Sequence, residues 1–262
     1  MKMFVGGGFA ALLVPSSALA VSPFDGTWKA DLKTAQLPQK PQTILLKDGV
    51  FTCSTCKPVF TVKADGAFHP ITNQPYTDEA KMEVVDEHTI VETDKLKGKV
   101  TNVARQTVST DGKTMTASWT DTSAPDGKAT TGSGTMTRVG MAPAGAHAIS
   151  GSWRQASVAN ISDAALTETL ALNGDWLSLT TPNGYSYKAK LGGQKVPLVG
   201  DTAETMVAVK RTGAMTLFEE DSRKGEVVNT YTMTLLPGGK TMKVVSRNAK
   251  QGTDTIYVMK KL

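Results

Sequence analysis

The chain is poor in the residues from which catalytic and metal sites are usually built. Its 262 residues include only two cysteines and three histidines. The histidines, His69, His88 and His147, are far apart, and none belongs to an HExxH motif. The G-x-S-x-G nucleophile elbow and the phosphate-binding P-loop motif are absent as well. These absences argue against common hydrolase and nucleotide-binding sites, so we expect no catalytic residue, no metal site and no cofactor.

Long apolar runs are also scarce. The most apolar stretch lies in residues 1–20, where Met1 and Lys2 precede a run that ends at Ala18-Leu19-Ala20. This pattern predicts a signal peptide cleaved near Ala20, and therefore a periplasmic or secreted protein. No later stretch approaches the ~18 consecutive apolar residues of a membrane-spanning helix, so we expect a protein that is not embedded in the membrane.

Charge of one sign is not concentrated along the chain. The formal net charge is +5, and it falls to +4 once Lys2 leaves with the signal peptide. Nucleic-acid-binding domains gather Lys and Arg on one face with aromatic residues between them. Only Lys260 and Lys261 come close to such a cluster. We therefore expect no nucleic-acid partner, and the sequence carries no signal for a particular oligomeric state.

The dominant positive feature is an internal duplication. Three motifs occur twice, in the same order, 125 to 127 residues apart. The pairs are Gly26-Thr27-Trp28 with Gly151-Ser152-Trp153, Lys97-Gly98-Lys99-Val100 with Lys224-Gly225-Glu226-Val227, and Asp111-Gly112-Lys113-Thr114-Met115 with Gly238-Gly239-Lys240-Thr241-Met242. Repetition in order at near-constant spacing indicates one folding unit present in two copies.

Each copy has the pattern of a series of short antiparallel strands. Apolar or amide side chains alternate with Thr-rich, charged positions, which predicts one buried face and one wet face. The predicted inner positions are Val100, Asn102, Ala104, Gln106 and Val108 in one copy and Val227, Asn229, Tyr231, Met233 and Leu235 in the other. Helix is nearly absent, because only residues 162–166 suit a single turn, capped by Ser162.

We therefore predict an all-β protein of two consecutive up-and-down barrels, each with about eight to nine antiparallel strands. Closing each meander into a barrel would remove its exposed edges. Residues 21–140 would form barrel 1, residues 141–147 a short uncharged linker, and residues 148–262 barrel 2. The alternative is one fused barrel of about sixteen strands, although each copy carries its own start and end signals.

The motifs resemble those of a known superfamily. A Gly-x-Trp on the first strand and a basic residue on the last strand are similar to the lipocalin and fatty-acid-binding (calycin) superfamily, here in a tandem, exported bacterial form. The resemblance implies that each Trp closes one end of a barrel and that the last-strand basic residue packs over it. It would pair Trp28 with Arg138, and Trp153 with Lys260 or Lys261. A helix beside the barrel, the second common element of that superfamily, is not evident.

The two cysteines form a Cys53-Ser54-Thr55-Cys56 motif. Haem attachment needs a His after the second Cys, where Lys57 stands, and zinc needs two further ligands that no nearby Cys or His supplies. Redox-active CxxC pairs lie at a helix N-terminus, whereas this one falls in a strand–turn–strand segment. In an exported protein we expect a Cys53–Cys56 disulfide that staples a hairpin and stabilises the fold modestly.

An interior that is not fully apolar is the main indication of function. Buried amides need hydrogen-bond partners, which a ligand or water in the lumen would supply; bonding to each other, or a place near the barrel mouth, is the alternative. Arg211 shares its phase with Val207 and Val209, so it could hold an anionic head group at the mouth of barrel 2, or else lie at a solvated hairpin end. The candidate ligand-binding residues are Asn102, Gln106, Trp119, Arg211, Asn229 and Tyr231. The candidate structural residues are Trp28, Arg138, Trp153, Lys260, Cys53 and Cys56.

Three functions fit these expectations. The first is a non-enzymatic protein that binds a small apolar or amphipathic ligand in a barrel lumen. The second is a structural or protein-interaction module whose barrels are filled by side chains. The third is a small-barrel isomerase or cyclase, which would require an inward carboxyl group of raised pKa, with Glu92 or Glu219 as candidates. Features that both copies share are expected to belong to the fold, and features of one copy to the function.

Overall fold

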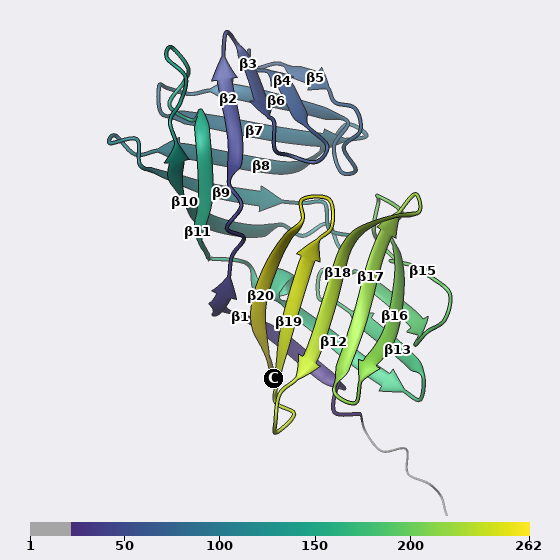
Figure 1. Ribbon diagram of the computed structural model, residues 1–262. Coiled ribbons are helices and arrows are strands. Elements are labelled where there is room, and N and C mark those ends of the chain that lie inside the picture. Colours follow the sequence, from purple (N-terminus) through teal and green to yellow (C-terminus); the bar gives the residue numbers. More distant parts are fainter. Residues whose placement is uncertain (1–21) are drawn as a thin grey trace, which may run out of the picture.

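The computed structural model describes residues 22–262, and these residues form two nearly closed antiparallel β-barrels (Figure 1). The all-β prediction is confirmed, but each sheet has ten strands rather than eight or nine. The predicted signal peptide lies outside the described residues. The one helix in this range, α1 (Asp163–Leu166), is the predicted single turn, although the Ser162 side chain does not cap it.

In the first sheet each strand pairs with its neighbours along the chain, except that β2 pairs with β11. In sheet order they are β4 (Phe60–Lys63), β3 (Val50–Cys53), β2 (Gln42–Lys47), β11 (Gly151–Ala159), β10 (Thr130–Gly140), β9 (Thr114–Asp121), β8 (Lys99–Val108), β7 (Thr89–Leu96), β6 (Glu79–Val84) and β5 (Phe68–Pro70). We call this sheet the first barrel.

The second sheet repeats the same order with the other copy. Its strands are β14 (Ser186–Lys190), β13 (Trp176–Thr180), β12 (Thr167–Asn173), β1 (Gly26–Gln36), β20 (Thr253–Lys261), β19 (Thr241–Asn248), β18 (Glu226–Leu235), β17 (Thr216–Arg223), β16 (Met206–Gly213) and β15 (Val196–Pro197). We call this sheet the second barrel.

The two copies exchange their opening strands. Strand β1 was expected to open the first barrel, but it lies between β12 and β20 of the second barrel. In Figure 1 the purple strand β1 accordingly runs with the yellow-green strands of the lower barrel. Strand β11, the opening strand of the second copy, lies between β10 and β2 of the first barrel. Each barrel therefore combines residues of both copies.

The connections explain this exchange. The segment between β10 and β11 joins two neighbouring antiparallel strands of the first barrel, so residues 141–147 do not separate the barrels. The chain instead crosses between barrels twice, from β1 to β2 and from β11 through α1 to β12. Pairing β11 with the strand just before it closes a short loop, which costs less chain entropy than pairing with a distant strand.

Backbone hydrogen bonds link the sheet edges. In the first barrel Gly66 N donates to Met82 O at 3.1 Å, and in the second Gly192 N donates to Val209 O at 2.7 Å. An isolated bridge between Ser186 and Val199 adds to the closure of the second barrel. Near-complete closure leaves little unpaired strand edge on which another chain could pair.

A tryptophan closes one end of each barrel, but the basic residues over them are exchanged like the strands. Arg138 lies 4.0 Å from the ring of Trp153, and the Lys261 ammonium lies 4.8 Å from the ring of Trp28. The predicted pairs, Trp28 with Arg138 and Trp153 with Lys260 or Lys261, are therefore wrong. Lys260 points outward and forms an ion pair with Asp31 at 2.7 Å. Both tryptophans are fully buried.

Arg138 is expected to be worth more to stability than its counterpart Lys261. Its guanidinium donates hydrogen bonds to the carbonyls of Gly112, Ala148 and Ser150, whereas Lys261 Nζ donates only to Pro23 O. Arg138→Ala should lower the free energy of unfolding by about 3 kcal/mol, and Lys261→Ala by about 1 kcal/mol. Urea denaturation measures both, and equal losses would contradict the prediction.

One predicted inner position faces outward. Val100 is 45% exposed, whereas its neighbour Thr101 is 9% exposed. A register shift opposite Asp94 and Lys95 inserts a bulge that reverses the phase at the start of β8. Beyond the bulge, Val108 is buried as predicted.

Candidate functional site

The second barrel encloses a group of carboxyl and phenol side chains beyond its tryptophan. The carboxyl groups belong to Glu168 on β12 and to Glu219 and Asp221 on β17, and we call these three residues the acidic cluster. Glu219 and Asp221 are 7% and 8% exposed, and Glu168 is half-buried because it borders a cavity. Alternation along β17 places Glu219 and Asp221 on the same, inner face.

Three tyrosines surround this cluster, and we call them the lumen tyrosines: Tyr187 on β14, Tyr231 on β18 and Tyr257 on β20. The Tyr187 hydroxyl donates to Glu219 Oε2 at 2.5 Å. Tyr231 lies directly across from Glu219 in the strand register. Burial and the nearby carboxylates raise the pKa of all three tyrosines above the ordinary value, so they stay protonated at neutral pH.

The acidic cluster has almost no compensating positive charge. Among residues 22–262, no Lys, Arg or His forms an ion pair with Glu168, Glu219 or Asp221. Arg223 is the cation that most affects Asp221, but its guanidinium bonds to Thr205 Oγ1 and to the hydroxyl of Tyr76. Asp221 Oδ1 is buried without any hydrogen-bond partner.

Burial without positive partners changes the titration of these carboxyl groups. It raises the pKa of Glu219 to about 8, with further contributions from Asp221 and Glu168. Burial alone raises the pKa of Glu168 to about 7. Burial also raises the pKa of Asp221 to about 6, against the opposing effect of Arg223. Glu219 is therefore largely protonated at neutral pH and poised to take part in proton exchange.

A cavity of about 490 Å³ connects this interior with the helix α1. Its inner wall includes Glu168, Tyr257 and Met259. Most of the remaining wall is apolar and comes from β1 and the residue after it, from the end of β11, and from α1 and the residues before it: Ala30, Leu32, Ala35, Leu37, Val158, Ile161, Ala164, Ala165 and Leu166. The cavity is thus an apolar passage that leads to a carboxyl group.

The first barrel carries a related but different interior. Glu92 and Asp94 on β7 lie 127 residues before Glu219 and Asp221. Burial raises the pKa of Glu92 to about 8, and Asn102 Nδ2 donates to Asp94 Oδ2 at 3.0 Å. A second cavity, of about 370 Å³, borders Asp94, Asn102 and Asp121 and is mostly polar.

The two cavities approach each other where the barrels meet. Tyr185 lines both of them. Tyr76 of the first copy donates its hydroxyl to Asp201 Oδ1 at 2.9 Å, and Arg223 bonds to the same hydroxyl. Backbone contact continues at Asp126, whose N–H donates to Asn183 O. Polar contacts therefore join the barrels beside both openings.

Five of the six predicted ligand-binding residues lie on interior strand faces, and one does not. Trp119 packs on Gly132, where a side chain would overlap its ring. Gln106 Oε1 is buried without a partner. Asn102 lines the cavity of about 370 Å³, and Asn229 and Tyr231 lie across from Asp221 and Glu219.

Arg211 is the exception. Its side chain is exposed near the end of β16, where Nη1 donates to Ala214 O at 2.9 Å. The guanidinium lies 5.9 Å from the Phe24 ring, at the end closed by Trp28. The strand carries Arg211 to the end of the barrel, and this placement fits the alternative of a solvated hairpin end.

The acidic cluster was missed as a binding site, although part of it left a signal in the sequence. The pattern Thr89-x-x-Glu92-x-Asp94 returns as Thr216-x-x-Glu219-x-Asp221. Comparison of the copies could have found both pairs. Glu168 left no such signal, because Gln42 takes its place: Gln42 lies across from Trp153 as Glu168 lies across from Trp28.

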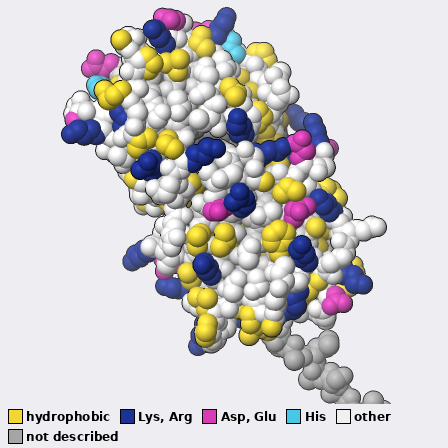
Figure 2. Space-filling view, in the orientation of Figure 1, with side chains coloured by type: hydrophobic (Ala, Val, Ile, Leu, Met, Phe, Trp, Pro, Cys, Tyr) yellow, Lys and Arg dark blue, Asp and Glu magenta, His cyan; other side chains and the backbone are white. Residues whose placement is uncertain are grey.

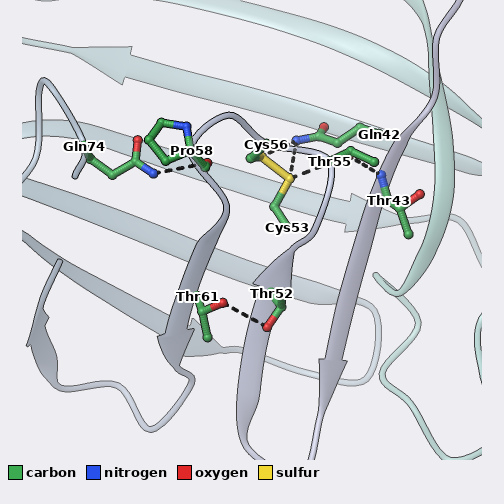
Figure 3. Close-up of a disulfide and its surroundings, with 9 residues drawn as sticks. All are labelled: Gln42, Thr43, Thr52, Cys53, Thr55, Cys56, Pro58, Thr61 and Gln74. Atoms are coloured by element: carbon green, nitrogen blue, oxygen red, sulfur yellow. Dashed lines mark hydrogen bonds between the residues drawn. A yellow bond between two sulfur atoms is a disulfide. The ribbon is translucent and has the colours of Figure 1, made fainter. Parts of the chain in front are cut away.

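The disulfide is present between Cys53 and Cys56, as predicted. Figure 3 shows the Gln42 amide directed at both sulfur atoms, and its Nε2 lies 3.3 and 3.4 Å from them. Thr55 Oγ1 accepts a hydrogen bond from Thr43 N at 2.8 Å. These contacts tie the turn after β3 to β2, which fits a structural role.

Other chemistry finds little support in the described chain. Within residues 22–262, no group of three His, Cys, Asp or Glu side chains is arranged to hold a metal ion. His69 pairs with Asp65 at 2.7 Å, and His88 lies 3.6 Å from Glu87. No helix in the same range is long and apolar enough to cross a membrane. On the face drawn in Figure 2, Lys and Arg side chains are dispersed, with Asp and Glu among them.

No protein-family model matches this chain, and no curated protein matches it.

Proposed function

We propose that this protein is an exported, lipocalin-like binding protein that holds a small amphipathic molecule in the second barrel. The observation that carries the proposal is the cavity of about 490 Å³, with apolar walls and the Glu168 carboxyl at its inner side. Ligand sites typically combine an apolar enclosure of this size with a few polar groups that orient the ligand. The signal-peptide pattern of residues 1–20 supports a periplasmic or secreted location.

The same cavity argues against a purely structural module with filled barrels. Met233, Met242 and Met259 pack the end near Trp28, but the space beside α1 is left open. The first barrel has the smaller and more polar cavity, so we assign the amphipathic ligand to the second.

Blocking the cavity beside α1 should weaken binding. Ala164 on α1 lines the cavity, so Ala164→Trp should weaken the binding of an apolar fluorescent probe at least about tenfold. Ala67→Trp, at an exposed turn of the first copy, is the control and should leave binding unchanged. Mass spectrometry of a solvent extract of the purified protein should identify the bound compound. An empty extract together with no probe binding would refute the proposal.

A second candidate is an isomerase or cyclase activity. The required inward carboxyl groups are present, since Glu92 and Glu219 are both enclosed and their pKa values are raised to about 8. The hydrogen bond from Tyr187 to Glu219 joins two groups able to exchange protons with a substrate. Recovery of the extracted compound unchanged after incubation with fresh protein would favour binding over catalysis.

A further inference from the structure

We propose that the ligand of the second barrel is an amphipathic amine, with its ammonium group at the acidic cluster and its apolar chain beside α1. This inference rests on the proposed binding function and adds the chemical class of the ligand. The interior of the second barrel holds three carboxyl groups, and the described chain places no paired cation among them.

Enclosed carboxyl groups without partners destabilise a fold, and a bound positive group would offset this cost. Glu168 makes no ion pair in the described chain, and its pKa is shifted by burial alone. Asp221 Oδ1 is buried and has no partner. An ammonium group offers three N–H donors and one positive charge, and it matches these acceptors. An anionic ligand would be repelled, and a neutral one would leave the charge uncompensated.

The aromatic side chains around the acidic cluster also favour an ammonium head group. The lumen tyrosines lie on three different strands around the cluster, and aromatic ring faces attract cations. The Tyr187 hydroxyl is already bonded to Glu219. Two carboxyl groups line the cavity, Asp31 and Glu168, and Asp31 is neutralised by its ion pair with Lys260. Glu168 is therefore the carboxyl group that is available to a ligand there.

The remaining cation candidates fit less well. A metal ion would need several ligands at short range, and no suitable group of three exists within residues 22–262. Arg223 stands at the edge of the cluster, but Thr205 and Tyr76 hold its guanidinium. The long apolar wall of the cavity calls for an apolar chain on the ligand, and a simple inorganic cation has none.

The first barrel provides an internal contrast. At the position across from its tryptophan it has Gln42, not Glu168, and the Gln42 amide contacts the disulfide. Across from its half-buried glutamate, Glu92, it has Ala104, not a tyrosine. The amine site is therefore a property of the second barrel alone.

Three ligands with one chain and different head groups test the inference. Isothermal titration calorimetry of the chain without residues 1–20 should be run with decylamine, decanol and decanoate. We expect decylamine to bind at least about tenfold more tightly than decanol, and decanoate to bind most weakly. Because the ammonium ionises the acidic cluster, amine binding should release protons, and the heat should depend on the ionisation enthalpy of the buffer.

Variants separate the head-group contact from general binding. Glu168→Gln should remove most of the preference for decylamine while the affinity for decanol stays unchanged. Glu92→Gln, in the first barrel, should change neither. The thermal melt of each variant reports whether it is folded, and Glu168→Asp offers a second test that keeps the charge and should retain the preference.

The outcomes are distinct. If none of the three compounds binds, the binding function itself fails. If decanol or decanoate binds as tightly as decylamine, the binding function stands and the amine inference is overturned. A preference for decylamine that survives in Glu168→Gln would also overturn it.

Discussion

A fragment of residues 37–160 is expected to fold by itself, whereas residues 148–262 are expected to remain unfolded. The first fragment contains β2 to β11, which are all ten strands of the first barrel in one uninterrupted segment. The second lacks β1, which seals the barrel between β12 and β20 and supplies the fully buried Trp28. Loss of one large buried aromatic alone costs about 3–5 kcal/mol, which is a large part of a domain's stability.

Near-UV circular dichroism and urea titration of each fragment measure this directly. A peptide of residues 22–37 added to residues 148–262 should restore the cooperative transition, because it supplies β1 and Phe24. Residues 21–140, the unit expected from the repeat, should fail to form a stable barrel, since β11 is missing between β10 and β2. Cooperative unfolding of residues 148–262 without the peptide would disprove the exchange.

The free energy of unfolding is expected to fall by a few kcal/mol as the pH rises from about 5 to about 8.5. Burial raises the pKa of Glu92 and Glu219 to about 8, above the ordinary glutamate value. Between the two pKa values the unfolded chain has lost these protons and the folded chain still holds them. The folded state therefore binds more protons, and stability decreases with pH at about 1.4 kcal/mol for each unit of pKa difference. Below the ordinary value both states are protonated, so the full stability is present there.

Glutamine variants identify the groups responsible. Glu219→Gln should flatten the pH dependence in the second barrel, and Glu92→Gln should do so in the first. Glu226→Gln is the control: Lys250 lowers the pKa of Glu226, so any change belongs to acidic pH and not to this range. Denaturant titrations at a series of pH values measure the slope, and stability that rises between pH 5 and 8.5 would contradict the assignment.

The elements that were predicted correctly depend on local sequence. Period-two alternation placed Val108 and Met233 inside, and both are buried. The Cys53–Cys56 spacing and the expected oxidising location led to the disulfide. The bulge at the start of β8 was not predictable, because it depends on the pairing with β7 and leaves Val100 exposed.

The candidate site was predicted only in part. Tyr231, Asn229 and Asn102 lie in interiors that also hold the carboxyl groups. The rule that shared features belong to the fold misled the choice of site, because both copies share the Glu and Asp of β7 and β17, which are half-buried in β7 and buried in β17. No local sequence pattern could identify Glu168 as a site residue, since its burial beside the other carboxyl groups depends on the strands that surround it.

The sequence by itself determined that the protein is a duplicated β-structure, because repeats, alternation and turn residues are local properties of the chain. It could not determine which copy's opening strand completes which barrel. The motifs Gly26-Thr27-Trp28 and Gly151-Ser152-Trp153 are nearly the same, so either strand offers a similar apolar face to either barrel. Only the tertiary structure decided this, since the connections between strands choose among pairings of similar energy. The same assembly places Glu168 near Glu219, although the two are distant in sequence, and it exposes Glu168 to the cavity from which we infer the function.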